Sequence, residues 1–234
     1  MALEGEGGGL IDSRPMGRAR ILLLGAMLAV SGCDAVKDVV TPRDRYSEAA
    51  FQRWLAADAG RKRDYERFQH FLADKDVGDV VPAWQLLRTD ANYAGRCGLG
   101  AFDMPPEAKW PAIVPALRLV RDDVIPVVGR VEVAASNRSD ALNQCVHGAK
   151  GSRHLAFAAV DLVAQEMSDQ RQLFTDLCAM HQRIGARDRM GLGAYFDPDR
   201  PFASRHARFH IDQAGYRTWG FDYTRKSSYC LKLA

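Results

Sequence analysis

The sequence predicts an α+β fold, with an antiparallel sheet flanked by helices and preceded by a helical extension. Apolar residues recur at helical spacing within the extension, residues 46–96, and again between residues 111 and 129. In the last third of the chain, short segments separated by glycines indicate strands joined by turns. Helices first and mixed strands afterwards are typical of α+β proteins. The 234 residues, 47% of them hydrophobic, suffice for one domain with extensions.

Residues 16–33 have the features of a bacterial export signal that ends at a lipid-modified cysteine. Arg18 and Arg20 supply a positive start, and an apolar run follows over residues 21–30. A helix of that length covers about 18 Å, well short of the roughly 30 Å hydrocarbon core of a bilayer. The closing letters VSGC resemble a lipobox, in which cleavage leaves Cys33 as the lipidated first residue. The alternative is a short buried helix that happens to end in cysteine.

On the first interpretation the chain is a lipoprotein of the cell envelope, anchored to a bacterial membrane and facing the periplasm. Residues 1–15 are then upstream sequence, and residues 34–45 are a polar tether. The 32 basic and 29 acidic residues leave a net charge of only +3, which argues against a nucleic-acid partner. We expect a monomer whose membrane contact is made through the lipid.

Two helices are predicted in the extension, the first of them capped by Ser47. The residues expected to face the core are Phe51, Trp54 and Leu55 in the first helix and Tyr65, Phe68 and Leu72 in the second. Downstream, Pro111 suits the first turn of a helix that ends at Pro126 and Gly129. The apolar stripe expected on this helix is Ile113, Leu117, Val120 and Val124.

The second half of the chain alternates between strand and helix patterns. Residues 130–135 alternate as in a strand, and residues 140–146 suit a short helix. Ser168 is a candidate cap for a longer helix that stops at Gly185. His181 falls on the apolar face of that helix, so we interpret it as a core histidine and not as a ligand.

Four cysteines remain if Cys33 carries lipid, an even number that permits two disulfides in an oxidising compartment. They are Cys97, Cys145, Cys178 and Cys230. We favour Cys97–Cys145, which flanks one helix–strand unit, and Cys178–Cys230, which joins the long helix to the C-terminus. Four buried free thiols are the alternative, and the spacing indicates no zinc ribbon.

The segment GSRHLAFAAVDL carries the first candidate chemistry, in Ser152, His154 and Asp161. In a straight strand His154 and Asp161 would lie about 23 Å apart on opposite faces. In a helix they would share a face at a separation of about 10 Å. Ligands of one zinc ion each lie about 2.0–2.2 Å from the metal. If both residues bind one ion, the chain must therefore bend between them.

This segment resembles the S-x-H-x-x-G-x-A-x-D signature of the zinc D-alanyl-D-alanine carboxypeptidases and dipeptidases. The resemblance extends upstream through VEVAASNRSDALNQCVHGAKGSRH and downstream to ARFHIDQAGYRTW. It covers about residues 97–223, more than half the chain. The family resemblance implies a domain of the Hedgehog/DD-peptidase fold, which we place at residues 97–234.

Carried over by position, the resemblance makes His154, Asp161 and His210 the ligands of a zinc ion. Two imidazoles and one carboxylate leave zinc a free position, as in catalytic sites. The resemblance further implies that Arg138 binds a substrate carboxylate and that Ser152, taken to share a strand face with His154, contacts substrate. The implied reaction is hydrolysis of D-alanyl-D-alanine or related bonds in peptidoglycan stem peptides.

Two positions depart from the family pattern. Phe157 stands where glycine is usual, and the positions that often supply the general base hold Ala207 and Arg208. Asp212 is the nearest acid on the same strand face as His210, so we assign it as the base or as a partner of the site. His206 would need a bulge to contribute. The missing base leaves a second hypothesis, a peptidoglycan-binding lipoprotein that keeps the fold without catalysis.

Overall fold

The computed structural model describes residues 44–90, 93–199 and 207–233, which lie within one compact unit. Cys33, the lipobox, His206 and most of the predicted tether fall outside the described residues. Asp44 and Arg45, the last two residues assigned to the tether, instead form a 3₁₀ turn with Tyr46, which is buried. Across the described ranges, no helix has both the length and the apolar character needed to cross a membrane.

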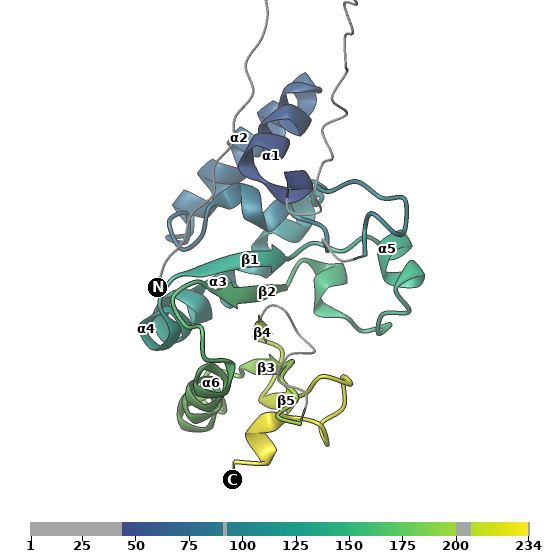
Figure 1. Cartoon of the computed structure of the whole chain (residues 1–234). Coiled ribbons are helices and arrows are strands. Elements are labelled where there is room, and N and C mark those ends of the chain that lie inside the picture. Colours follow the sequence, from purple (N-terminus) through teal and green to yellow (C-terminus); the bar gives the residue numbers. More distant parts are fainter. Residues whose placement is uncertain (1–43, 91–92, 200–206, 234) are drawn as a thin grey trace, which may run out of the picture. The chain divides into compact units, whose positions relative to one another are not determined.

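The fold is α+β, with a five-stranded mixed sheet and flanking helices (Figure 1). The helices are α1 (Glu48–Ala56), α2 (Ala59–Asp74), α3 (Val114–Leu119), α4 (Ile125–Val128), α5 (Asp140–Cys145) and α6 (Gln170–Ile184). The strands are β1 (Val131–Ala135), β2 (Ala159–Ala164), β3 (Gly191–Ala194), β4 (Arg208–Asp212) and β5 (Arg217–Trp219).

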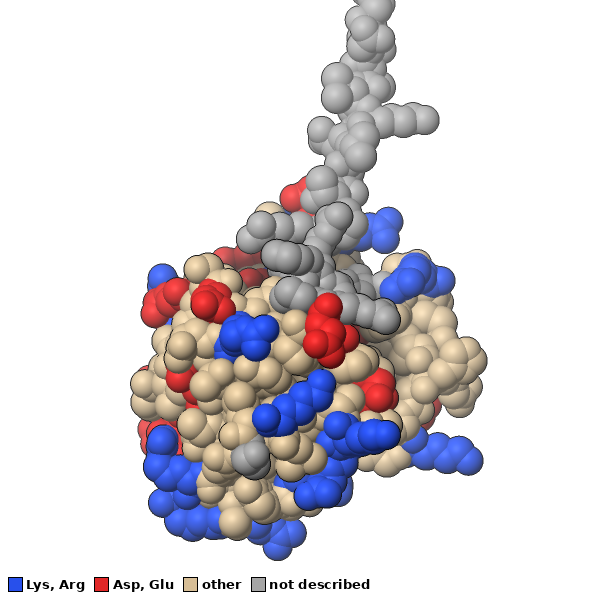
Figure 2. All heavy atoms as spheres, turned by 60° about the horizontal axis from the view of Figure 1, so that its bottom comes forward, with Lys and Arg blue, Asp and Glu red and all other residues tan. Residues whose placement is uncertain are grey.

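The surface carries charges of both signs, unevenly placed on the face that Figure 2 shows. Lys and Arg side chains predominate along the lower edge of this view, and Asp and Glu lie mainly higher up (Figure 2). The C-terminal segment, at the bottom of Figure 1, contributes the exposed Arg225, Lys226 and Lys232.

Helices α1 and α2 begin and pack largely as predicted. Ser47 caps α1 by accepting a hydrogen bond from the Ala50 amide, and Asp58 caps α2 in the same way. The α2 stripe is buried, and its Phe68 ring lies 5.2 Å from that of Trp110 and 6.0 Å from that of Phe157. The helical extension therefore shares its core with the sheet.

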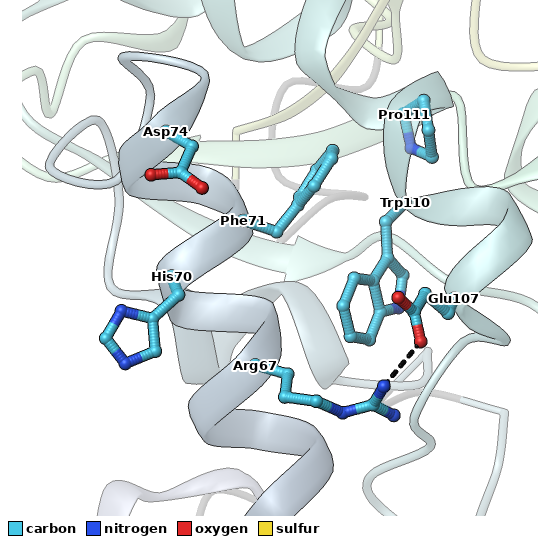
Figure 3. Close-up of a pocket in the computed structure, with 7 residues that line it drawn as sticks. All are labelled: Arg67, His70, Phe71, Asp74, Glu107, Trp110 and Pro111. Atoms are coloured by element: carbon cyan, nitrogen blue, oxygen red, sulfur yellow. Dashed lines mark hydrogen bonds and ion pairs between the residues drawn. The ribbon is translucent and has the colours of Figure 1, made fainter.

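A pocket of about 360 Å³ opens between α2 and the 3₁₀ segment Glu107–Ile113 (Figure 3). Phe71 and Trp110 face one another across it, with ring centroids 5.8 Å apart. Arg67 pairs with Glu107 at 2.7 Å along its side. None of the predicted ligands lines this pocket, so it is separate from the candidate metal site.

The helix predicted from Pro111 to Gly129 is segmented. Pro111 lies inside the 3₁₀ segment, and a π-helical turn, Val120–Val124, separates α3 from α4. The prediction that Pro126 helps to end this helix is wrong, because Pro126 directly follows the π-helical turn and the helical run continues past it to Val128. Gly129 ends α4 with a positive φ of 75°.

The sheet has the strand order β1-β2-β4-β3-β5. The pairs β1–β2, β2–β4 and β3–β4 are antiparallel, as predicted, whereas β3 and β5 are parallel. The sheet is therefore mixed and not purely antiparallel. Strands β2 and β4 carry two of the three predicted ligands, Asp161 and His210.

The two faces of the sheet differ in chemistry. On one face β2, β3 and β4 present apolar side chains that are fully buried, and α3 packs against β2 and β4 there. These side chains are Val160, Leu162, Leu192, Phe209 and Ile211. Because side chains alternate along a strand, the residues between them point to the opposite face, which carries Asp161, His210 and Asp212.

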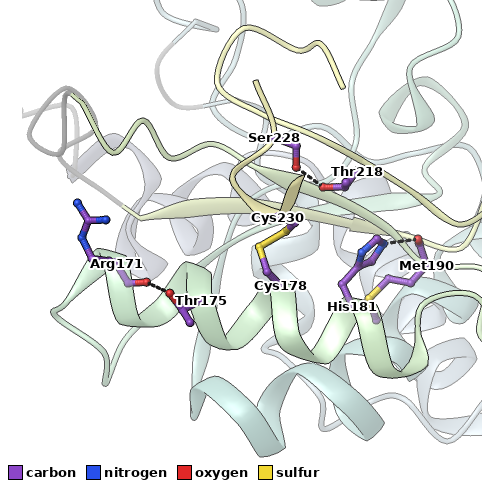
Figure 4. The surroundings of a disulfide bond; sticks show 8 residues. All are labelled: Arg171, Thr175, Cys178, His181, Met190, Thr218, Ser228 and Cys230. Atoms are coloured by element: carbon purple, nitrogen blue, oxygen red, sulfur yellow. Dashed lines mark hydrogen bonds between the residues drawn. A yellow bond between two sulfur atoms is a disulfide. The ribbon is translucent and has the colours of Figure 1, made fainter. Parts of the chain in front are cut away.

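The structure has two disulfides, Cys97–Cys145 and Cys178–Cys230, which is the pairing favoured from the sequence. The second joins α6 to the C-terminal 3₁₀ turn (Figure 4). The cap of α6 is Asp169 and not Ser168, since the Asp169 carboxylate accepts hydrogen bonds from two amides of the first turn. His181 lies in the core, 3.1 Å from the Met190 carbonyl oxygen, as expected.

Candidate metal centre

Strand register brings two of the three predicted ligands together. Asp161 on β2 lies directly opposite His210 on β4, and Gly193 on β3 flanks His210 on its other side. Directly opposed residues on antiparallel strands have Cβ atoms about 4.5–5.5 Å apart, so their side chains meet on one face. The β2–β4 pairing thus brings together in space two motifs that are far apart in the sequence.

His154 joins them through the bend that a shared ion requires. It lies in a 3₁₀ turn, Arg153–Ala156, immediately before β2. Phe157 ends that turn in the left-handed conformation, with φ 55° and ψ 39°. This is the conformation that glycine adopts most readily. Full burial of the phenyl ring offsets the backbone cost here.

The potential ligand atoms form a tight cluster. His154 Nε2 lies 3.1 Å from His210 Nδ1 and 3.3 Å from an Asp161 carboxylate oxygen, and His210 Nδ1 lies 2.9 Å from the other oxygen. Two atoms that are each 2.0–2.2 Å from a tetrahedral ion lie about 3.3–3.6 Å apart. All three residues are buried, and together they could hold a metal ion.

The nitrogen that each histidine turns toward the cluster is set by its other ring nitrogen. His154 Nδ1 lies 2.7 Å from the Ser136 carbonyl oxygen, to which it can only donate a hydrogen bond. His210 Nε2 lies 2.9 Å from an Asp212 carboxylate oxygen. His154 therefore offers Nε2 and His210 offers Nδ1, with each ring oriented by a partner behind it.

Asp212 fits the second of its two predicted roles. Its carboxylate is fully buried on the Nε2 side of His210, away from Nδ1, and Arg217 binds both of its oxygens at 2.9 and 2.6 Å. Burial alone would raise the pKa of Asp212, but the hydrogen bonds from His210 and Arg217 hold it well below its usual range. A carboxylate held in this way is a poor general base, so the prediction of Asp212 as the base is not supported by the geometry.

Arg208 is the main contact that the sequence reasoning missed. Its guanidinium forms an ion pair with Asp161 and another, at 2.9 Å, with the buried Asp90. Burial would lower the pKa of Arg208, but these two carboxylates raise it. The alternation of residues 208, 210 and 212 along β4 was the signal that could have placed Arg208 beside the ligands.

The same charges act on the ligands themselves. Burial would raise the pKa of Asp161, but Arg208 and His154 hold it well below its usual range. Burial lowers the pKa of His154. For His210 burial acts in the same direction, but hydrogen bonds to Asp161 and Asp212 raise the pKa. These directions favour an ionised Asp161 and a neutral His154, and they favour the protonated form of His210.

Of the two predicted substrate residues, Arg138 contacts residues of the site and Ser152 precedes the turn that carries His154. The Arg138 guanidinium lies 3.8 Å from the Asp90 carboxylate, and the Arg138 amide donates to the His154 carbonyl oxygen at 3.1 Å. The prediction that Ser152 shares a strand face with His154 is wrong, because the chain turns there. Ser152 directly precedes the 3₁₀ turn that carries His154.

Two glycines on β3 leave space for the side chains behind His210. A Cβ atom on Gly193 would lie 2.8 Å from the Trp219 ring and 2.9 Å from His210 Cβ. A Cβ atom on Gly191 would lie 2.6 Å from the Arg217 guanidinium and 2.8 Å from the Asp212 carboxylate. Both contacts are closer than real Cβ atoms approach, so the absence of side chains here lets β5 support the site.

Comparisons with protein-family models, with curated proteins and with solved structures give no match to this chain. The functional argument therefore rests on the geometry of the site and on the motifs in the sequence.

Proposed function

We propose that this protein is a zinc-dependent peptidase that hydrolyses D-alanyl-D-alanine or related peptide bonds in peptidoglycan, on a fold of the Hedgehog/DD-peptidase type. The observation that carries the proposal is the meeting of His154 Nε2, His210 Nδ1 and the Asp161 carboxylate within 4.8 Å of one another. Their residue types and order match the motifs that suggested the family.

Zinc suits this donor set, and the resemblance of the motifs favours it over other metals. Two imidazole nitrogens and one carboxylate oxygen are a common catalytic zinc set, and both histidines are oriented by partners as zinc-ligating histidines usually are. When bound at such a site, zinc acts as a Lewis acid that polarises a carbonyl group and activates water.

The surrounding residues then have separate tasks. Ser136 and Asp212 fix the ring orientations, and Arg208 holds the Asp161 carboxylate in place. Arg138 is proposed to bind a substrate carboxylate, and Ser152 to contact the peptide. The exposed Arg225 and Lys226 would attract stem peptides, which carry carboxylates.

Mass analysis of muropeptides after incubation with the zinc-loaded protein tests this function. We expect loss of D-alanine or cleavage of a D-alanyl bond by the wild-type protein, and no reaction with His154→Ala. His70→Ala is the matched control, since His70 is exposed on α2 and lines the separate pocket. Unchanged muropeptides with the zinc-loaded wild type would contradict the proposal.

One observation favours a second candidate, a peptidoglycan-binding protein without catalysis. In the described part of the chain, the possible metal group contains no acid beyond Asp161, and Arg208 stands two residues before His210. The same experiment separates the two functions, because the binding protein would retain zinc and bind muropeptides but leave them intact.

The location proposed for either function is the cell envelope, with Cys33 lipidated and the domain facing the periplasm. The two disulfides support this proposal, because disulfides persist in oxidising compartments.

A further inference from the structure

The exposed large hydrophobic side chains of the described residues are all found in the C-terminal segment. They are Tyr216, Phe221, Tyr223, Leu231 and Leu233. Tyr223 is the most exposed of them, at 70%. Exposed apolar side chains scattered singly are ordinary, but a group of them within one segment marks a candidate binding surface.

The backbone of Tyr223 is in a conformation that a bulky residue rarely adopts. Its φ is 64°, in the left-handed region that favours glycine. Asp76, His147, Phe157 and Arg189 share this feature; the first three each lie at the end of a helix, where it is common, and Arg189 lies in the turn between α6 and β3. Tyr223 follows no helix, and burial does not offset its backbone cost. Strain of this kind tends to occur at functional sites.

The turn that carries Tyr223 imposes this conformation. The Tyr223 amide donates to the Gly220 carbonyl oxygen at 3.0 Å, and the Gly220 amide donates to the Thr224 carbonyl oxygen at 3.0 Å. The Asp222 carboxylate accepts hydrogen bonds from the amide and the hydroxyl of Thr224, at 2.8 and 2.7 Å. The turn thus projects the Tyr223 ring in a fixed direction.

Aromatic contacts connect that ring to the metal centre. Tyr223 packs edge-on against Tyr195, with centroids 5.6 Å apart, and the Tyr195 hydroxyl accepts a hydrogen bond from Trp219 Nε1 at 3.4 Å. The Trp219 ring lies 5.0 Å from that of His210. Burial, with the charge of Asp161, raises the pKa of Tyr195, so its hydroxyl stays protonated beside the site.

We propose that Tyr223 is a substrate-binding residue of the metal centre, held by the turn 220–228 so that its ring packs on the bound peptide. The ligand class is a peptide with small aliphatic side chains, which contact the ring, and a carbonyl group that accepts a hydrogen bond from the phenol. This inference rests on the proposed peptidase function and deepens it by naming a residue that recognises the peptide.

Replacing Tyr223 by glycine separates a binding role from a structural one. Glycine relieves the strain at a φ of 64°, so Tyr223→Gly should melt at the same temperature as the wild type or a few degrees higher. A tyrosine that served only to stabilise the fold would instead give a lower melting temperature on removal. Tyr223→Phe keeps the ring and tests the hydroxyl alone.

The experiment uses the zinc-loaded full chain and a stem pentapeptide that ends in D-Ala-D-Ala. For Tyr223→Gly we expect the zinc content and the kcat to stay close to those of the wild type. The Kd for the peptide, measured by calorimetry, and the KM should each rise about tenfold. Phe221→Ala, which removes another exposed ring from the same turn, should leave all four quantities unchanged.

Two results would overturn the inference while leaving the proposed function intact. One is peptide binding by Tyr223→Gly as tight as by the wild type, and the other is a marked fall in its melting temperature. If the wild type itself neither binds nor cleaves the pentapeptide, the proposed function fails, and the assignment of Tyr223 fails with it.

Discussion

At the scale of single residues, the partners behind the two histidines decide which nitrogen each can offer to a metal. His210 turns Nδ1 toward His154 and Asp161 because its Nε2 faces the Asp212 carboxylate. That carboxylate is in turn held by Arg217. Contacts of this type raise the basicity of a ligating histidine and fix its tautomer.

Replacing Asp212 by asparagine should weaken zinc binding without removing it. The amide keeps the shape of the side chain but loses the charge that orients His210, so we expect zinc affinity to fall about 10–100-fold. Competition with a chelator measures this directly. Asp122→Asn is the control, since Asp122 also pairs with an arginine but lies on the surface. An affinity equal to that of the wild type would show that Asp212 does not support His210.

Phe157 allows a second prediction at the residue scale: replacement by glycine should leave the protein more stable than replacement by alanine does. Truncation of a buried phenylalanine to alanine costs about 3–5 kcal/mol. Phe157→Gly loses the same packing but relieves the left-handed backbone, so it should be more stable than Phe157→Ala by about 1 kcal/mol. Urea unfolding of both variants checks this. Alanine is normally the more stable of the two, and that order here would contradict the backbone argument.

At the scale of elements, β3 supports the site by carrying no side chains on the site face. Gly193→Ala would bring a Cβ atom within 2.8 Å of the Trp219 ring and within 2.9 Å of His210 Cβ, closer than real Cβ atoms approach, so one of these residues must shift. We expect a loss of about 1–3 kcal/mol in unfolding free energy, together with weaker zinc binding. Gly100→Ala, whose nearest contact would be an ordinary 3.5 Å, should change neither. Wild-type zinc affinity in Gly193→Ala would contradict the role given to β3.

The Cys178–Cys230 disulfide joins α6 to the segment that follows β5. It therefore stabilises both β5, which carries Trp219, and the turn that carries Tyr223. Its two cysteines are 52 residues apart, and closing a loop of that length stabilises a fold by about 2–4 kcal/mol. The double variant Cys178→Ala/Cys230→Ala should lose stability by that amount in denaturant unfolding. Equal stability, or four free thiols in the oxidised wild-type domain, would contradict the pairing.

At the scale of the whole molecule, the sequence predicted features that depend on local pattern. The stripe of α2, the cap at Ser47 and the need for a bend between His154 and Asp161 all follow from residues close together in the chain. The sequence did not predict the parallel pairing of β3 with β5, because long-range packing decides which strands pair and leaves no local signal.

The same distinction holds within the site. The ligand types and their order were readable from the motifs, but the tautomer of His210 and the ion pair of Arg208 with Asp161 depend on contacts between different strands. Of the two roles predicted for Asp212, the geometry favours that of a partner of the site over that of a base. Its strand parity was correct, whereas the side of His210 that it contacts could be known only from the structure.

Anomalous diffraction at the zinc edge, from crystals of the zinc-loaded protein, tests the central claim most directly. The account predicts one strong peak about 2.0–2.2 Å from His154 Nε2, His210 Nδ1 and an oxygen of Asp161. A peak elsewhere, a peak on the Nε2 side of His210, or no peak in a crystal grown with excess zinc would contradict it.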